Sequence, residues 1–105
     1  MNTNFIEIVR DNLSNFITAP KLLVIFGSRG CGYCREIKPK LKNVSELLPM
    51  AYIEVSMCPR SVLLYPKKIT AYPTFAYFER GYFKATVDPK TIWFDIEKII
   101  NDEYL

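Results

Sequence analysis

Two cysteines three residues apart, Cys31 and Cys34, are the residues of this chain best suited to chemistry. They follow an apolar run at residues 22–26 and open a segment with helical periodicity. At the start of a helix such a pair lies on one face, where unpaired N–H groups and the positive end of the helix dipole stabilise a thiolate. A thiolate attacks disulfides and a thiol does not. The spacing therefore favours a redox-active dithiol over a structural crosslink.

Other uses of a cysteine pair have less support in this sequence. A tetrahedral zinc site needs four ligands, and the chain has three cysteines and no histidine. A carboxylate or a second chain could complete such a site, so a zinc or iron–sulfur carrier bridging two chains stays an alternative, as does a pair without redox function. The lack of histidine excludes the Cys–His catalysis of proteases.

Length and composition indicate one ordered domain. We expect residues 1–105 to form a single domain around one hydrophobic core, since half of the residues are apolar and 7 Phe and 7 Tyr add large side chains. No uncharged apolar stretch approaches the roughly 20 residues of a membrane span. The first ten residues do not resemble a secretory signal, and three cysteines make a poor disulfide framework. These features predict a cytoplasmic protein with no membrane partner.

The net charge of +3 is unevenly distributed along the chain. Residues 21–68 hold nine Lys or Arg and three Glu, whereas the other residues hold five Lys or Arg and eight Asp or Glu. The basic segment includes the cysteine pair, which favours acidic partners and helps to lower the pKa of Cys31. Nucleic acid is the competing partner, but no nucleic-acid-binding motif accompanies the charge, so we expect none to bind.

Hydrophobic periodicity predicts alternating strands and helices. Strands are expected at residues 5–9, 21–26, 51–55, 74–78 and 82–87, the last two as a hairpin. Helices are expected from Asp11 or Asn12 to about residue 17, at 31–48, at 60–65 and at 89–101. As an alternative, residues 3–17 could form one helix. The preferred order, βαβαβαββα, indicates an α/β fold with a mixed sheet covered by helices on both faces.

The two longest predicted helices each have an apolar face that should pack on the sheet. Pro39 lies inside the first and should kink it. The expected inward residues are Ile37, Leu41, Val44, Leu47 and Leu48 in the first helix, and Ile92, Phe94, Ile96, Ile99 and Ile100 in the second.

This order of elements, with a C-x-x-C pair opening the second helix, resembles the thioredoxin family over nearly the whole chain. Cys31 and Cys34 match the family's redox pair, and Pro39 matches its helix-kinking proline. The stretch Tyr72-Pro73-Thr74 matches the residue–Pro–Thr signature before the hairpin, whose proline is cis. Together, in order and at near-family spacing, these motifs make a strong signal for a thioredoxin fold.

The resemblance implies a thiol–disulfide oxidoreductase that exchanges disulfides with partner proteins, Cys31 being the nucleophile and Cys34 the resolving thiol. Its redox group would be the Cys31–Cys34 disulfide itself, with no other cofactor and no metal. Protein disulfides would be the substrates, and a thioredoxin-reductase-type enzyme or glutathione the reductant, for a protein that acts as a monomer.

The remaining candidate site residues surround this pair. The backbone at Tyr72 would bind an extended substrate segment by strand addition. Arg29 and Arg35 are placed to stabilise the Cys31 thiolate electrostatically. The expected substrate-binding residues are Gly32, Tyr33, Tyr72, Pro73 and Thr74.

The chain also departs from the family pattern. Gly30 stands where thioredoxins usually have Trp, and Tyr33 stands where they have Pro. Ile25 replaces a buried Asp that assists proton transfer, and the Lys facing that Asp falls near Tyr52. Both members of the ion pair are therefore missing together, which avoids burying one charge alone.

Two alternative functions follow from the same residues. One is a glutaredoxin-like enzyme that uses glutathione, because a Tyr within the C-x-x-C pair is common in that family. The other is a non-catalytic binding protein with a thioredoxin fold. The third cysteine, Cys58, is expected to be a buried free thiol.

Overall fold

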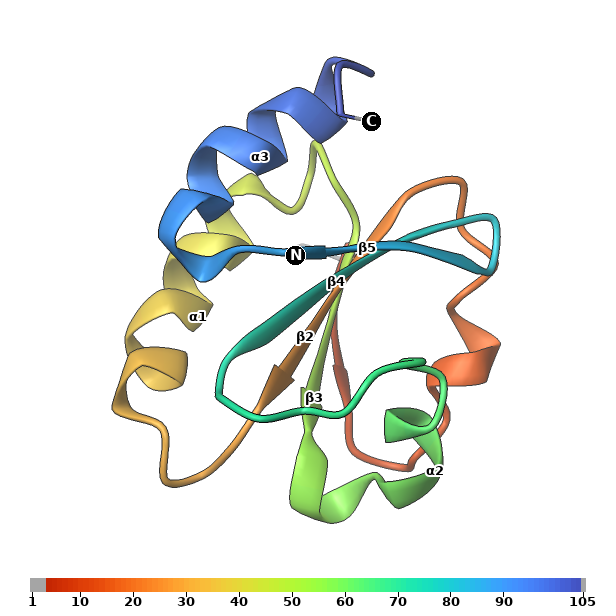
Figure 1. The fold of residues 1–105 in the computed structure, drawn as a ribbon, viewed down its shortest axis with the longest axis vertical. Coiled ribbons are helices and arrows are strands. Elements are labelled where there is room, and N and C mark those ends of the chain that lie inside the picture. Colours follow the sequence, from red (N-terminus) through yellow and green to blue (C-terminus); the bar gives the residue numbers. More distant parts are fainter. Residues whose placement is uncertain (1–3, 105) are drawn as a thin grey trace.

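A five-stranded mixed sheet forms the centre of the protein (Figure 1), whose computed structural model describes residues 4–104. The strands are β1 (Phe5–Ile8), β2 (Leu22–Gly27), β3 (Met50–Glu54), β4 (Thr74–Glu79) and β5 (Tyr82–Val87). They lie in the order β1-β3-β2-β4-β5. β3 runs parallel to both β1 and β2, whereas β4 is antiparallel to β2 and to β5. The mixed sheet predicted from the sequence is confirmed.

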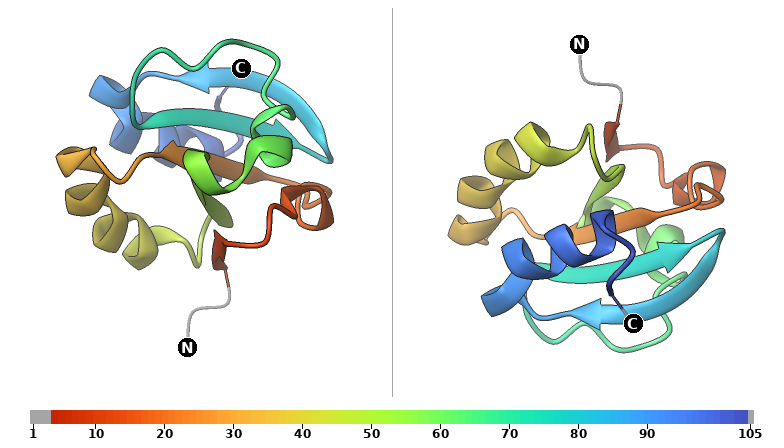
Figure 2. Two further views of the ribbon diagram at one scale, coloured as in Figure 1. Left: turned by 90° about the horizontal axis from the view of Figure 1, so that it is seen from below. Right: turned by 90° about the horizontal axis from the view of Figure 1, so that it is seen from above.

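Helices cover both faces of this sheet, as predicted. α1 (Gly32–Val44) and α3 (Ile92–Ile100) lie together on one side, and the short α2 (Pro59–Val62) lies on the other (Figure 2). Single 3₁₀ turns occupy Leu13–Asn15, Val55–Met57 and Pro89–Thr91. Within residues 4–104, no helix has the length and apolar character that crossing a membrane requires.

The side chains of β2 point alternately to the two faces of the sheet, and the core therefore has two layers. All six residues of β2 are buried, as expected of a continuous apolar run. Leu23 and Ile25 pack with the inward side chains of α1 and α3. Leu22, Val24 and Phe26 point to the opposite layer, which contains Leu13 and Cys58. The central strand is thereby fixed on both faces, and its carboxyl end at Gly27 leads directly to the cysteine pair.

The helix predicted from Asp11 or Asn12 is reduced to the 3₁₀ turn Leu13–Asn15, and the alternative of one helix over residues 3–17 is wrong, since β1 begins at Phe5. Asp11 has a backbone φ of 54°, outside the helical region. Its carboxylate accepts hydrogen bonds from the backbone N–H groups of Arg60 (2.9 Å) and Ser61 (2.6 Å). Asp11 thus caps α2, which is distant in sequence, and does not cap a helix that follows it directly in the chain.

Other predicted boundaries shift for local reasons. The helix predicted over 31–48 ends at Val44, where the buried Ser45 hydroxyl donates to the carbonyl of Lys42 (2.8 Å). Leu47 is 69% exposed and Phe94 is 61% exposed, so both assignments to inward faces are wrong. The strand predicted at 51–55 is Met50–Glu54, the helix at 60–65 is Pro59–Val62, and the helix at 89–101 begins as a 3₁₀ turn.

The cap on α2 makes stability depend on pH. Desolvation raises the pKa of Asp11, but the hydrogen bonds from Arg60 and Ser61 outweigh it and leave this pKa below its usual value. The ionised carboxylate therefore stabilises the fold above about pH 4, and this contribution is lost as the pH falls through the lowered pKa. We expect Asp11→Asn to melt at a lower temperature than the wild type at pH 7, and the difference to close in acid. A constant difference in melting temperature down to pH 2 would contradict this.

Candidate active site at the Cys31–Cys34 pair

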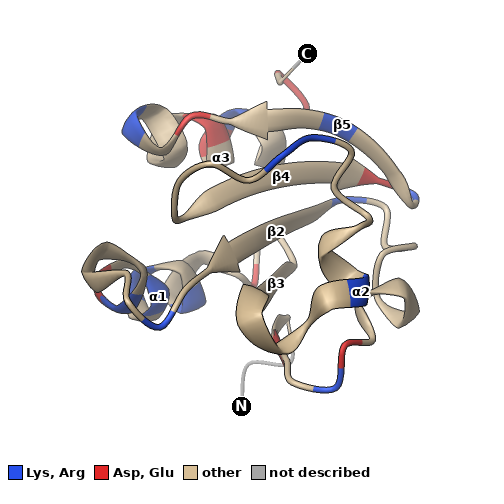
Figure 3. Ribbon diagram, turned by 60° about the horizontal axis from the view of Figure 1, so that its bottom comes forward, with Lys and Arg blue, Asp and Glu red and all other residues tan. Residues whose placement is uncertain are grey.

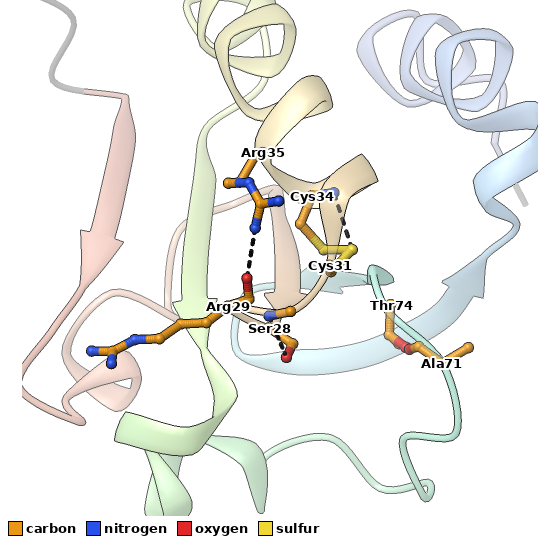
Figure 4. Close-up of a disulfide and its surroundings, with 8 residues drawn as sticks. Ser28, Arg29, Cys31, Cys34, Arg35, Ala71 and Thr74 are labelled. Atoms are coloured by element: carbon orange, nitrogen blue, oxygen red, sulfur yellow. Dashed lines mark hydrogen bonds between the residues drawn. A yellow bond between two sulfur atoms is a disulfide. The ribbon is translucent and has the colours of Figure 1, made fainter.

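The turn between β2 and α1 places the cysteine pair. Cys31 is the N-cap residue of α1, and its own N–H donates to the carbonyl of Ser28 (3.0 Å). The Ser28 hydroxyl accepts the N–H of Gly30 (3.4 Å). Cys31 and Cys34 form a disulfide, with their Cα atoms 5.2 Å apart (Figure 4). Ser28, which the sequence analysis did not single out, therefore holds the turn in which the first cysteine lies.

The two sulfur atoms have different surroundings. The Cys34 N–H donates to the Cys31 sulfur at 3.0 Å, so a backbone donor of the first helical turn is directed at the first cysteine. Cys31 is partly exposed, whereas Cys34 is fully buried. In the reduced protein the same donor and the helix dipole would stabilise a thiolate on Cys31. The pair can therefore present one reactive sulfur to a partner while the other is covered.

The loop before β4 completes the surface around Cys31. The Tyr72–Pro73 peptide bond is cis, Pro73 is buried, and the Thr74 hydroxyl donates to the Ala71 carbonyl at 2.7 Å (Figure 4). An open hollow of about 520 Å³ lies over Cys31, between Tyr33 and Tyr72. Tyr33 and Tyr72 are 43% and 41% exposed.

This hollow brings together some of the predicted substrate-binding residues and not others. Gly32, Tyr33 and Tyr72 line it with Cys31, whereas Pro73 and Thr74, the first residue of β4, do not line it. Gly30 also lines it, and a Cβ atom added there would meet nothing within 4 Å. The glycine at the position where thioredoxins usually have Trp therefore leaves one wall open.

Arg29 and Arg35 lie on the opposite side of the disulfide from Ala71 and Thr74 (Figure 4). Arg35 donates to the carbonyl of Arg29 at 2.6 Å, and an Arg29 guanidinium nitrogen lies 3.7 Å from the sulfur of Met57. Neither arginine forms an ion pair with a carboxylate of residues 4–104. Positive charge continues along α1 (Figure 3). Stabilisation of a Cys31 thiolate by these charges stays a prediction.

Below the cysteines, the central strands carry no buried ion pair. Ile25, fully buried, is the register partner of Tyr52 on the parallel strand β3. The two positions that would hold the family's Asp and Lys are therefore neighbours, and both are uncharged. In residues 4–104, no group of three or more His, Cys, Asp or Glu is arranged to hold a metal ion.

Cys58 is a buried free thiol, as predicted, on the face of the sheet covered by α2. Its S–H donates to the carbonyl of Ile8 at 3.4 Å, and burial raises its pKa. Both features make it unreactive.

Alkylation should therefore separate the three cysteines. With reduced native protein at neutral pH, we expect iodoacetamide to modify Cys31 first and to leave Cys58 unmodified until denaturant is added. Mass spectrometry of peptides from each cysteine would measure the order. Modification of Cys58 in the native protein at the rate of Cys31 would contradict its burial.

Comparison with known proteins identifies the family. The thioredoxin family model matches residues 2–101. The structure is similar to those of Schistosoma mansoni thioredoxin and of its reduced pre-protein, each with 25% sequence identity and a TM-score of 0.76 over 93% of this chain. The match covers 94% of the thioredoxin and 96% of the pre-protein. A designed protein shares the fold at 23% identity, with a TM-score of 0.71, over 93% of this chain and 94% of its own.

None of the curated proteins compared with the chain matches it. The family match, the five-stranded mixed sheet and the disulfide-bonded cysteines at the start of α1 are nevertheless consistent with one another. The chain belongs to the thioredoxin family, and its Cys31–Cys34 pair is that of a thiol–disulfide oxidoreductase.

Proposed function

We propose that the protein is a protein-disulfide oxidoreductase in which Cys31 is the nucleophile and Cys34 the resolving thiol. The observation that supports this most directly is the asymmetry of the pair: Cys31 is partly exposed and accepts a backbone N–H, whereas Cys34 is fully buried. A partner disulfide can therefore approach Cys31 alone.

The reaction proceeds by two exchanges. The Cys31 thiolate attacks one sulfur of the partner disulfide, forming a Cys31–partner bond and releasing the other partner sulfur as a thiolate. Cys34 then loses its proton and attacks Cys31, which forms the Cys31–Cys34 disulfide and releases the second partner thiolate. Two electrons pass to the partner, and the released thiolates take up protons from water. With Ile25 at the position of the family's Asp, water is also the proposed acceptor of the Cys34 proton.

The surface around Cys31 suits an extended protein segment. Gly32 and Gly30 leave space above the sulfur, and Tyr33 and Tyr72 offer exposed rings on two sides. The cis Pro73 and the hydrogen bond from Thr74 to Ala71 keep the Tyr72 backbone at the edge of the hollow. Strand addition at Tyr72 would hold the segment while its disulfide reacts.

Electrostatics favours a pair that is more oxidising than a typical thioredoxin. Neither Arg29 nor Arg35 forms a salt bridge within residues 4–104, although Arg29 lies near the Glu54 carboxylate. Positive charge beside the pair stabilises the Cys31 thiolate, and stabilising the reduced form raises the reduction potential. We expect a potential above the roughly −270 mV of thioredoxin.

Equilibration with glutathione buffers of graded ratio, quenched by alkylation and analysed by mass, would test both proposals. A single two-electron transition with a midpoint above about −270 mV is the expected result. A lower midpoint would contradict the electrostatic argument. Cysteines that stay unreactive would contradict the enzymatic function and favour a binding protein.

The proposal includes the compartment in which the protein acts and the source of its electrons. A reducing compartment, the cytoplasm, suits a chain with one buried free thiol outside the redox pair. A thioredoxin-reductase-type enzyme or glutathione would supply electrons to a monomer. Full activity with glutathione alone would indicate the glutaredoxin-like alternative.

A further inference from the structure

A second pocket, of about 260 Å³, lies beside the hollow over Cys31. It opens where β1 and β3 meet the start of α1, and Ser28 lines both cavities. The side chains that decide its chemistry are Glu7, Arg29, Arg35, Lys38, Tyr52 and Glu54. We call it the basic pocket, because three of these six side chains are cations and two are carboxylates.

The carboxylates of the basic pocket already have partners within the chain. Glu7 forms ion pairs with Lys38 and, at 3.9 Å, with Lys42. One Glu54 oxygen accepts the N–H of Ser56 at 3.0 Å and its hydroxyl at 2.5 Å. These hydrogen bonds, with a contribution from nearby Arg29, lower the pKa of Glu54.

The arginines of the pocket keep donors that no described carboxylate uses. Arg35 uses one N–H group on the Arg29 carbonyl, and the Arg29 guanidinium makes a long contact to the sulfur of Met57 and acts on the Glu54 carboxylate through its charge. Neither guanidinium has an ion pair within residues 4–104. A guanidinium carries five N–H donors, so both retain capacity to bind an anion.

Tyr52 adds a neutral donor, and Gly27 makes room for it. A Cβ atom at Gly27 would lie 2.2 Å from the Tyr52 hydroxyl oxygen, so only glycine lets this ring lie against β2. Lys38 lies over the ring, 4.7 Å from its centroid. Burial, with the charges of Glu54 and Glu7, raises the pKa of Tyr52, so the hydroxyl keeps its proton at neutral pH.

We propose that the basic pocket binds a carboxylate side chain of the partner segment that carries the disulfide. The inference rests on the proposed function, because the segment must lie over Cys31. The shared wall at Ser28 puts the pocket next to that segment, within reach of an Asp or Glu a few residues from the reacting cysteine. Surplus positive charge and unused arginine donors favour a carboxylate over an amide or a cation.

Matched peptide disulfides would test the pocket. Each peptide carries Glu, Gln or Lys at one of three positions on either side of its cysteine. The second-order rate constant for oxidation of the reduced protein by each peptide is measured at low ionic strength. At one position we expect Glu to exceed Gln by about fivefold, with Lys slowest. High salt should reduce this preference.

Variants separate the pocket from the general charge of α1. Arg35→Gln should bring the ratio of Glu to Gln peptides close to one, and Tyr52→Phe should lower it while keeping the ring. Lys40→Gln, which removes an exposed cation of α1 outside the pocket, should leave the ratio unchanged. Equal rates for Glu and Gln peptides at every position would overturn the proposal. It would also be overturned if Arg35→Gln kept the preference for Glu, or if Lys40→Gln removed that preference as completely as Arg35→Gln does.

The Gln peptides report disulfide exchange itself, so a failure of the pocket is distinguishable from a failure of the enzyme. If no peptide is reduced, the proposed function fails. The pocket is then tested by titrating the oxidised, isotope-labelled protein with cysteine-free Glu and Gln peptides. Amide shifts at Gly27 and Tyr52 with the Glu peptide alone would support carboxylate binding, and their absence would overturn it.

Discussion

Replacing Cys34 with Ser is expected to make the protein hold its partner in a covalent complex. Cys31 can still attack a disulfide, because its exposure and its place at the N-cap of α1 do not depend on the second sulfur. The mixed disulfide then persists, since Cys58 is buried in the opposite layer of the core and cannot resolve it. We expect turnover to fall by at least about a thousandfold, as for the loss of an essential catalytic nucleophile.

Non-reducing electrophoresis and intact mass would measure the trapped complex. Cys31→Ser should form no complex, because a hydroxyl is not ionised at neutral pH. Cys58→Ser should behave like the wild type and serves as the matched control. Full turnover by Cys34→Ser with glutathione would instead indicate a one-cysteine mechanism, in which glutathione resolves the complex.

The features that the sequence predicted correctly are those that depend on residues close together in the chain. The buried strand at residues 22–26, the hairpin and the position of the cysteine pair follow from apolar runs, turn residues and the start of a helix, all of which are local signals. Five strands were placed within a residue or two, and the fully buried β2 confirms the reading of its apolar run. Cys31 is the N-cap residue of α1 and Cys34 lies in its first turn, as the spacing of the pair indicated.

The errors concern residues whose role depends on contacts far along the chain. Asp11 resembles a helix cap in the sequence, but its partners are Arg60 and Ser61 on α2. Leu47 and Leu48 were both assigned to the inward face of a helix, but α1 ends at Val44, and Leu48 is buried whereas Leu47 is exposed.

The basic pocket was missed for a similar reason. It combines β1, the turn after β2, β3 and α1, which no sequence window contains together. Gly27, a glycine ending an otherwise apolar strand, was the available signal, since such a glycine often marks the close approach of another group. The sequence does not say that the group is the Tyr52 hydroxyl.

Introducing a carboxyl group at Ile25 tests why this chain lacks the buried ion pair of its family. Ile25 is fully buried, and its register partner Tyr52 supplies no positive charge. We expect Ile25→Asp to lower the free energy of unfolding at pH 7 by about 3–5 kcal/mol, because an unpaired charge in the core is strongly destabilising. Adding Tyr52→Lys should recover roughly 1–2 kcal/mol through the new pair, a coupling that a double-mutant cycle isolates.

The pH dependence of this loss identifies its cause. Burial would raise the pKa of the new carboxyl group above the roughly 3.9 of an unfolded Asp, so the native state would hold a proton that the unfolded state releases. Stability should therefore fall as the pH rises from about 4 to the raised pKa, and then level off. Urea unfolding at several pH values measures this, with Ile25→Asn as the uncharged control of similar shape. Parallel pH profiles for the Asp and Asn variants would mean that water or a donor reaches this position, and that the missing ion pair needs another explanation.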